Sequence, residues 1–193
     1  MRLCDLGDLR TGYQMRGAVD ITPEGLDRVV MVGDVLDHGI AWDKVVRTSL
    51  SRVAMKDFLA ANDIVIRSRG AHYGVTLITD PPGRTVAVAP LYILSVRRTD
   101  VLPAYVAWFL NRPASRKALA ALARGTSLPT ISIRDLGELE LPVPPMEAQR
   151  LVAAVADLGH RELELCKQLN DKRQRLAGAL FDRNMTRRGA ENE

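Results

Sequence analysis

Hydrophobic and polar positions alternate in short runs over the first hundred residues of this chain. Between residues 64 and 69 the alternation places Arg67 and Arg69 on one face of a strand that closes at Gly70. Similar runs predict further strands over residues 27–32, 74–79, 84–88 and 91–96. The strands over 74–79, 84–88 and 91–96 are expected to follow the strand over 64–69 in a meander. Glycines fall about every seven residues in positions 1–60, too often for ordinary helices, so this region is predicted to form strands and turns.

The pattern changes to a helical period after residue 100. Pro103 and Pro113 each suit the first position of a helix, and the second helix is predicted over residues 114–124. Two short strands are predicted after it, over residues 128–133 and 139–141. Strands followed by helices and further strands predict an α+β domain with a mixed or antiparallel sheet and two short helices.

Residues 146 to about 184 have the pattern of one long helix, because they contain no proline and their apolar positions recur with a heptad spacing. We call the residues at these positions the apolar seam: Leu151, Val155, Leu158, Leu165, Leu169, Leu176 and Leu180. Nearly forty helical residues span about 55 Å. A helix of this length with an apolar stripe needs a partner, so we expect it to pair as an antiparallel coiled coil. The alternative is a helix that folds back on its own domain.

These patterns divide the chain into three predicted parts. A compact domain is expected over residues 1–143, a long dimerisation and spacer helix over 144–184, and a disordered tail over 185–193. The length of 193 residues fits one domain with an extension, and 47% of the residues are apolar, which is enough for a core.

Composition indicates the cellular location of the protein and whether it has metal sites or disulfides. No apolar run is long enough to span a membrane, and the N-terminus has no stretch typical of a signal peptide. Cys4 and Cys166 lie far apart and are not part of a metal-binding pattern. We therefore expect a cytoplasmic protein without a structural metal or disulfide framework.

Positive charge is concentrated in the middle of the chain. Residues 64–134 hold ten Lys and Arg side chains against two acidic ones, whereas the net charge of the whole chain is only +4. Nine of the ten are arginine, whose forked guanidinium suits phosphates and guanine edges. This segment favours a nucleic-acid binder. The alternative is a solvated basic face on a protein of another kind.

Motifs for catalysis are absent. Asp80-Pro81-Pro82-Gly83 is similar to the base-holding tetrapeptide of adenine-N6 methyltransferases, but glycine stands where an aromatic ring would stack on a flipped base. We therefore interpret it as a hairpin turn. The histidines are isolated and the carboxylates are scattered, so no catalytic or metal-ligating residue is predicted and the chain is not expected to be an enzyme.

Three glycine-containing loops carry side chains that suit DNA. Each combines groups that position a phosphate backbone with groups that reach base edges. The first loop contributes Arg10, Thr11, Tyr13 and Arg16, the second Arg67, Ser68, Arg69 and Tyr73, and the third Thr126 and Ser127. Any one of these loops alone is common as a turn or a solvated strand end. Around the basic segment, together, they predict a DNA-binding surface.

Several motifs, taken in order, resemble the specificity subunits of Type I restriction–modification systems over about residues 3–182. The most specific are Trp108-Phe109-Leu110-Asn111 and Pro142-Val143-Pro144-Pro145-Met146-Glu147-Ala148-Gln149, with Gly125-Thr126-Ser127-Leu128-Pro129-Thr130-Ile131 between them. Members of this family usually carry two target recognition domains separated by two long antiparallel helices. This chain has one domain and one helix, so it resembles half of such a subunit.

The resemblance implies a function and a set of partners. The chain would recognise double-stranded DNA and direct modification subunits, which carry S-adenosylmethionine and methylate adenine, to a bipartite site. A restriction subunit would be a further, optional partner. A homodimer through the apolar seam would rebuild the usual arrangement and read a palindromic site. No cofactor is expected in this chain. Two alternatives stay open: a DNA-binding component of another phage-defence complex without adenine methylation, and an adaptor that binds only protein through its helix.

Overall fold

The computed structural model describes residues 1–190 apart from 16, 18, 37–38, 52 and 71–72, with the side chains of 182–190 also left undescribed. The chain divides into two compact units, Met1–Ala153 and Ala154–Glu193. The first unit holds all the strands and the three short α-helices, so the α+β class predicted from the sequence is confirmed.

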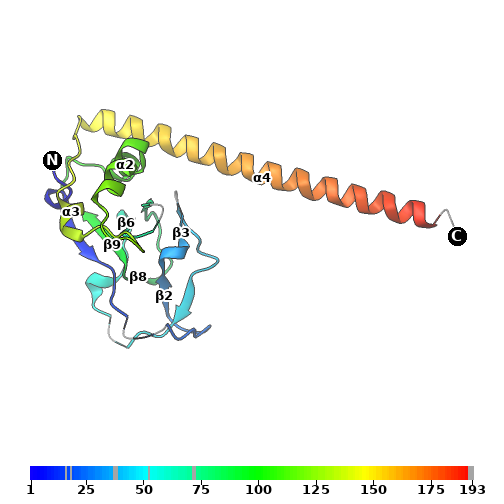
Figure 1. Ribbon diagram of the computed structural model, residues 1–193, viewed down its shortest axis with the longest axis horizontal. Helices are drawn as coiled ribbons and strands as arrows, with labels where there is room; N and C mark the ends of the chain where they lie inside the picture. The colour runs from blue at the N-terminus through cyan, green and yellow to red at the C-terminus, as the bar shows by residue number, and fades with distance from the viewer. Residues whose placement is uncertain (16, 18, 37–38, 52, 71–72, 191–193) are drawn as a thin grey trace. The chain divides into compact units, whose positions relative to one another are not determined.

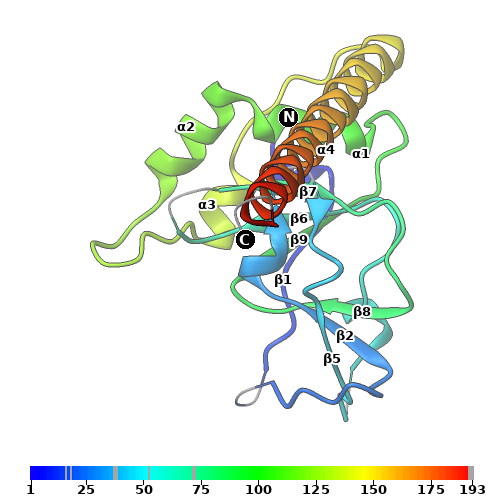
Figure 2. The ribbon, with the colours of Figure 1, turned by 90° about the vertical axis from the view of Figure 1, so that its right-hand side faces the viewer.

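A four-stranded antiparallel sheet is the centre of the first unit (Figures 1 and 2). Its strands, in the order in which they lie side by side, are β1 (Gly7–Thr11), β9 (Leu91–Val96), β6 (Asp63–Arg67) and β7 (Val75–Leu77). The order shows that strands far apart in the sequence are neighbours, because β9 lies between β1 and β6.

The remaining strands form two smaller sheets. One is mixed, since β2 pairs antiparallel with β5 and parallel with β8; the other is a two-stranded pair of β3 and β4. Their bounds are β2 (Asp27–Val30), β5 (Val46–Thr48), β8 (Arg84–Ala87), β3 (Val35–Leu36) and β4 (Gly39–Ile40). The described part of the first unit also has three short 3₁₀ helices: η1 (Leu3–Asp5), which precedes β1, η2 (Val32–Asp34) and η3 (Met55–Asp57).

The predicted meander is wrong beyond its first hairpin. β6 and β7 pair as expected, but β8 joins β2 in the smaller sheet and β9 returns to pair with β6. Pro81 and Pro82 follow β7 after three intervening residues, and proline has no backbone N–H to donate to a neighbouring strand. The segment 80–83 therefore connects two sheets and is not a hairpin turn.

Three short helices follow β9. α1 (Pro103–Asn111) and α2 (Pro113–Leu122) each begin with proline at the first helical turn, as predicted. α3 (Ile133–Gly137) was missed; it lies between the two short strands that were expected and shares only Ile133 with the first of them. Its signal is local, because the Ser132 hydroxyl accepts a hydrogen bond from the backbone N–H of Asp135 at 3.0 Å and so caps the helix. The segments predicted as strands over 128–133 and 139–141 hold only single bridge positions.

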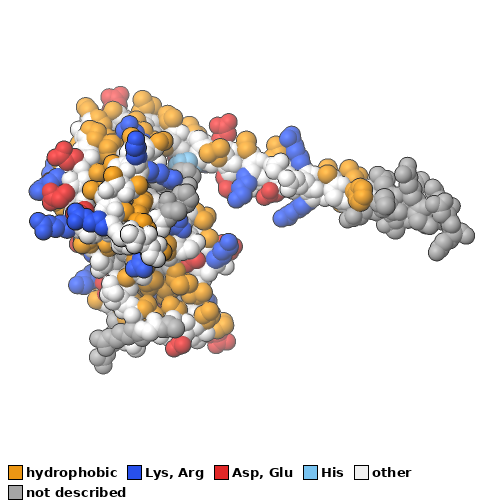
Figure 3. Space-filling model, viewed as in Figure 1, with side chains coloured by type: hydrophobic (Ala, Val, Ile, Leu, Met, Phe, Trp, Pro, Cys, Tyr) orange, Lys and Arg blue, Asp and Glu red, His pale blue; other side chains and the backbone are white. Residues whose placement is uncertain are grey.

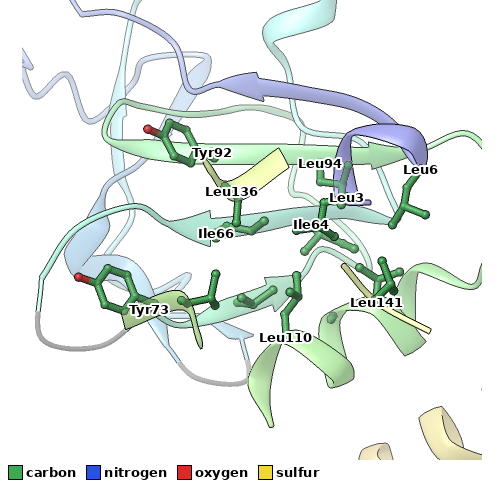
Figure 4. Packing of buried hydrophobic residues seen from close by; sticks show 14 of the residues in the cluster. Leu3, Leu6, Ile64, Ile66, Tyr73, Tyr92, Leu94, Leu110, Leu136 and Leu141 are labelled. Carbon is green, nitrogen blue, oxygen red and sulfur yellow. The ribbon is translucent and has the colours of Figure 1, made fainter. Parts of the chain in front are cut away.

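Two hydrophobic clusters lie against opposite faces of the main sheet, because alternate residues of each strand point to opposite sides. Ile64, Ile66 and Leu94 belong to the larger cluster, which includes residues of all three short helices (Figure 4). Val65 and Ile93 belong to the second cluster, together with residues of the smaller sheets. The alternation predicted for residues 64–69 thus separates two cores, with both faces of β6 buried.

The last helix, α4 (Met146–Ala190), begins at Met146, as its pattern predicted and two residues inside the expected spacer segment 144–184, because Pro144 and Pro145 precede it. It continues to Ala190, whereas a disordered tail was expected from 185; residues 191–193 lie outside the described part.

Within the first unit, the buried side-chain amide of Gln149 forms hydrogen bonds with three backbone groups. Its Oε1 accepts from Leu102 N–H at 2.8 Å, and its Nε2 donates to the carbonyls of Asp100 and Pro144 at 2.9 and 2.8 Å.

The apolar seam of α4 is uncovered in the single chain. Its seven residues are between 49 and 66% exposed. In the described residues, no helix is both long enough and apolar enough to cross a lipid bilayer.

Candidate nucleic-acid interface

One end of the main sheet carries all three of the loops that the sequence singled out. Tyr92, near the start of β9, pairs with Thr11 at the end of β1 and with Ile66 near the end of β6. Ile66 in turn pairs with Val75, the first residue of β7. The segments that follow β1, follow β6 and precede β7 therefore leave the sheet at the same end. The third loop, over residues 124–130, joins them through backbone hydrogen bonds with the second.

The first loop presents only part of its predicted set at the surface. Thr11 is exposed, and Tyr13 is half-buried against a small cluster that contains Val29 and Val86. Arg10 turns towards the other end of the sheet, where its Nη1 donates to Ser95 Oγ at 2.7 Å. Arg16 lies outside the described residues.

Arg10 also compensates a buried carboxylate. Its Nη2 lies 3.4 Å from Asp63 Oδ2, and the side chain of Asp63 is only 5% exposed. Asp63 accepts further hydrogen bonds from Ser95 Oγ and from the backbone N–H of Ala60. Arg10 is thus engaged inside the domain, which gives it a structural role that its sequence position did not indicate.

A hollow of about 460 Å³ opens beside the first loop. Its lining is mainly polar and consists of Thr11, Gly12, Tyr13, Gln14, Ser51, Lys56 and Asp57. Gly12 is needed at this point because a Cβ there would lie 2.6 Å from the carbonyl oxygen of Ala87.

Two predicted residues of the second loop are internal. Ser68 is 1% exposed and donates to the carbonyl of Pro90, and Tyr73 is 6% exposed with its hydroxyl 3.4 Å from the carbonyl of Pro129. Their polar atoms hold the loop to its neighbours and are not presented to solvent. The sequence could not separate them from surface residues, because Ser and Tyr serve both purposes.

Arg67 is half-buried and held in place. Its Nε and Nη2 both donate to the carbonyl of Val32, at 3.1 and 2.6 Å, while its Nη1 has no hydrogen-bond partner among the residues that the structure describes. Arg69 differs, since its side chain is exposed and makes no ion pair within the described part of the chain.

Thr130 joins the second and third loops. Its backbone exchanges two hydrogen bonds with Arg124, at 2.9 and 3.0 Å, which closes the loop that carries the exposed Thr126 and Ser127. Thr130 also stands opposite Arg69 in an antiparallel bridge. Nothing in the sequence indicates this contact between residues about sixty positions apart.

Positive charge without a salt-bridge partner also lies away from these loops, since Arg97 follows β9 at the other end of the main sheet. In the described part of the chain, Arg97, Lys117 and Arg134 are exposed without a salt-bridge partner. Arg112 instead lies over the rings of Trp108 and Phe109, 5.3 Å from each centroid. Figure 3 shows Lys and Arg side chains over the region of α2 and α3, between apolar ones. Such a surface attracts a polyanion.

The residues that the structure describes contain no set of three or more His, Cys, Asp or Glu that could hold a metal ion. The Asp80–Gly83 segment is a connection in which the Pro82 carbonyl accepts hydrogen bonds from Arg28 and Thr85, both at 2.9 Å.

Comparison with known proteins shows which solved structures share this fold. No protein-family model matches the chain, and no curated protein matches it. Solved structures do. The S subunit of a Type I restriction–modification system from M. genitalium matches 85% of this chain, with a TM-score of 0.60 and 21% identity. The HsdS subunit from Thermoanaerobacter tengcongensis matches 86%, with a TM-score of 0.54 and 19% identity.

A third match comes from a structural study of complex assembly and conformational transition in the type I R-M system, with a TM-score of 0.61 and 18% identity over 86% of this chain. The match covers only 38 to 39% of each of the three solved chains, so this chain spans about two fifths of their length. At this identity the likeness shows a shared fold, the one predicted from the motifs.

Proposed function

We propose that this chain recognises double-stranded DNA as a specificity component of a Type I restriction–modification system. The observation that carries the proposal is the shared fold with S subunits over 85% of the chain. The basic loops at one end of the main sheet support it, because the expected electrostatic footprint of a DNA reader coincides with the loops that converge there.

The match to about two fifths of an S subunit supports a half-subunit with one target recognition domain, which we propose spans residues 1–143. We propose that the helix after it pairs with a second copy through the apolar seam, as an antiparallel coiled coil. Two identical domains related by a twofold axis read two identical half-sites, so the recognised site is bipartite and palindromic.

Catalysis is assigned to partner subunits in this proposal. Modification subunits supply S-adenosylmethionine and adenine methylation, and a restriction subunit joins them for cleavage. This chain contributes recognition alone and carries no cofactor.

Binding to duplex DNA over a salt series tests the proposal. A DNA reader loses affinity steeply as salt rises, because neutralising phosphates releases counterions. An adaptor that binds only protein shows no such binding, and that result would overturn the proposal.

Methylome sequencing of the host, with and without this chain, tests whether the chain works in a Type I restriction–modification system. Loss of adenine methylation at a bipartite palindrome supports the Type I assignment. DNA binding without any change in methylation favours a component of a different phage-defence complex.

A further inference from the structure

Arg69 and Arg124 are brought to the two sides of one residue, although 54 positions lie between them. Arg124 and Thr130 exchange backbone hydrogen bonds at 3.0 and 2.9 Å. On the other side, Gly70 N–H donates to Pro129 and Ile131 N–H donates to Ser68, at 3.4 and 2.8 Å, which places Arg69 opposite Thr130. The three residues thus form one row across a small three-segment ladder.

The row fixes the direction of the two arginines. Residues directly opposite each other in antiparallel segments have their side chains on the same face. The Cα atoms of such pairs lie about 5.5 Å apart when hydrogen-bonded and about 4.5 Å apart otherwise, so those of the two arginines are separated by roughly 10 Å. Both guanidinium groups therefore leave the same face, with Thr130 between them.

The backbone that carries the row is set before any ligand arrives. Gly70 and Gly125, which follow the two arginines, have φ of +106° and +107°, and no neighbouring atom would crowd a Cβ at Gly70. Glycine is therefore needed there for its left-handed conformation. Ser68 and Tyr73 hold the second loop by their buried hydroxyls. A ligand that binds such a preformed site loses little affinity to ordering it.

The charge of the row is free for a ligand. Arg69 is exposed and has no acidic partner in the described part of the chain. Arg124 has an 85% exposed side chain, and its ion pair with Asp135 is long, at 3.9 Å. A pair this exposed contributes little in water, so it competes weakly with a phosphate.

The neighbouring side chains favour phosphate over bases as the ligand. Residues 68–70 and 124–130 contain no Asn, Gln, Asp or Glu, the residue types that read adenine and cytosine edges. They supply hydroxyl groups and arginine, which position a DNA backbone, and guanine is the base whose edge arginine itself can read.

We propose that Arg69 and Arg124 form a phosphate clamp, a two-point contact that positions the DNA backbone independently of base sequence. The inference rests on the proposed DNA-binding function and assigns a role within it. It separates this pair from residues elsewhere that read bases.

The test uses the full chain and two duplexes, one selected by the wild-type chain from a random pool and one of unrelated sequence. Dissociation constants are measured by fluorescence anisotropy over a salt series for the wild type, Arg69→Ala, Arg124→Ala and the double variant. Arg69→Gln with Arg124→Gln is a second double variant that keeps long polar stems without charge. Arg47→Ala, which removes an exposed arginine from β5 in the smaller sheet, sets the effect of net charge alone.

The plot of log affinity against log salt has a negative slope. Each single change is expected to make this slope shallower by about one, and each double change by about two. Both duplexes should lose affinity by the same factor, so that their ratio stays that of the wild type. A slope unchanged in the double variants, or no different from that of Arg47→Ala, would overturn the clamp. A changed ratio between the duplexes would overturn it too, because the arginines would then read bases. If the wild-type chain itself binds neither duplex, the proposed function has failed and the clamp fails with it.

Discussion

The side-chain amide of Gln149 accepts a hydrogen bond from the backbone N–H of Leu102 at 2.8 Å, although 46 residues lie between them. Leu102 is the N-cap residue of α1, so this bond satisfies one of the N–H groups that a helix start leaves without a partner. The Pro-x-Pro-Pro-x-Glu-x-Gln motif thus has a structural explanation, because its last residue fastens the first turn of α4 to the start of α1.

Replacing Gln149 by Ala is expected to destabilise the domain. The change leaves the Leu102 N–H and the carbonyls of Asp100 and Pro144 without this partner, and each buried polar group left unpaired costs about 1–3 kcal/mol. The free energy of unfolding, measured by urea denaturation, should fall by at least about 1 kcal/mol on the same basis. Arg150→Ala, at the exposed neighbouring position, is the control; a Gln149→Ala variant as stable as this control would contradict the role of the amide.

Ser68 and Ser127 are expected to behave oppositely, although both belong to the predicted DNA-binding set. Ser68→Ala removes a buried hydroxyl and leaves the Pro90 carbonyl unsatisfied, so the unfolding free energy should fall by about 1–3 kcal/mol. Ser127→Ala changes an exposed hydroxyl and should leave stability within about 0.5 kcal/mol of the wild type. Thermal denaturation distinguishes the two, and equal effects would remove the distinction between inner and outer loop residues.

Replacing Leu165 and Leu169 by Glu is expected to give monomers if the apolar seam is the dimer interface. The two leucines are 64 and 49% exposed in the single chain, so the charges should cost the fold little while being costly between paired helices. Molar mass from light scattering measures the outcome. Leu163→Glu is the matched control, because Leu163 is 66% exposed but lies outside the seam. A dimer that survives the double change would place the interface elsewhere.

Replacing Arg10 by Ala is expected to lower the free energy of unfolding by more than it lowers the free energy of binding to DNA. Removing the guanidinium takes away a partner of the buried Asp63 carboxylate and of the Ser95 hydroxyl. Breaking a buried pair costs up to about 3–5 kcal/mol, and a 3.4 Å contact should fall below that range. Chemical denaturation and anisotropy on the same samples separate the effects; lost affinity with unchanged stability would return Arg10 to the DNA-contact set.

Local patterns were sufficient for the elements that local physics controls. The alternation over 64–69 predicted β6, prolines at 103 and 113 predicted the starts of α1 and α2, and the heptad spacing predicted α4. In each case the relevant period or steric restriction lies within a few neighbouring residues, so it is visible in the sequence.

Contacts between distant segments could not be predicted from the sequence. No local pattern places β9 between β1 and β6, sends β8 to the smaller sheet, or sets Thr130 between Arg69 and Arg124. Strand pairing is backbone hydrogen bonding, which all residues except proline offer alike, so the choice of partner depends on how both faces of the sheet are buried.

The sequence by itself determined that this protein has an α+β domain with a basic middle segment and a long amphipathic helix, because composition and periodicity are local properties. Only the tertiary structure decided which of the predicted DNA-contacting residues are available. It buries Ser68 and Tyr73, engages Arg10 with Asp63, and leaves Arg69, Thr126 and Ser127 exposed. The physical reason is that a polar side chain serves the interior or the surface according to whether packing supplies a partner for it, and those partners come from segments far away in the chain.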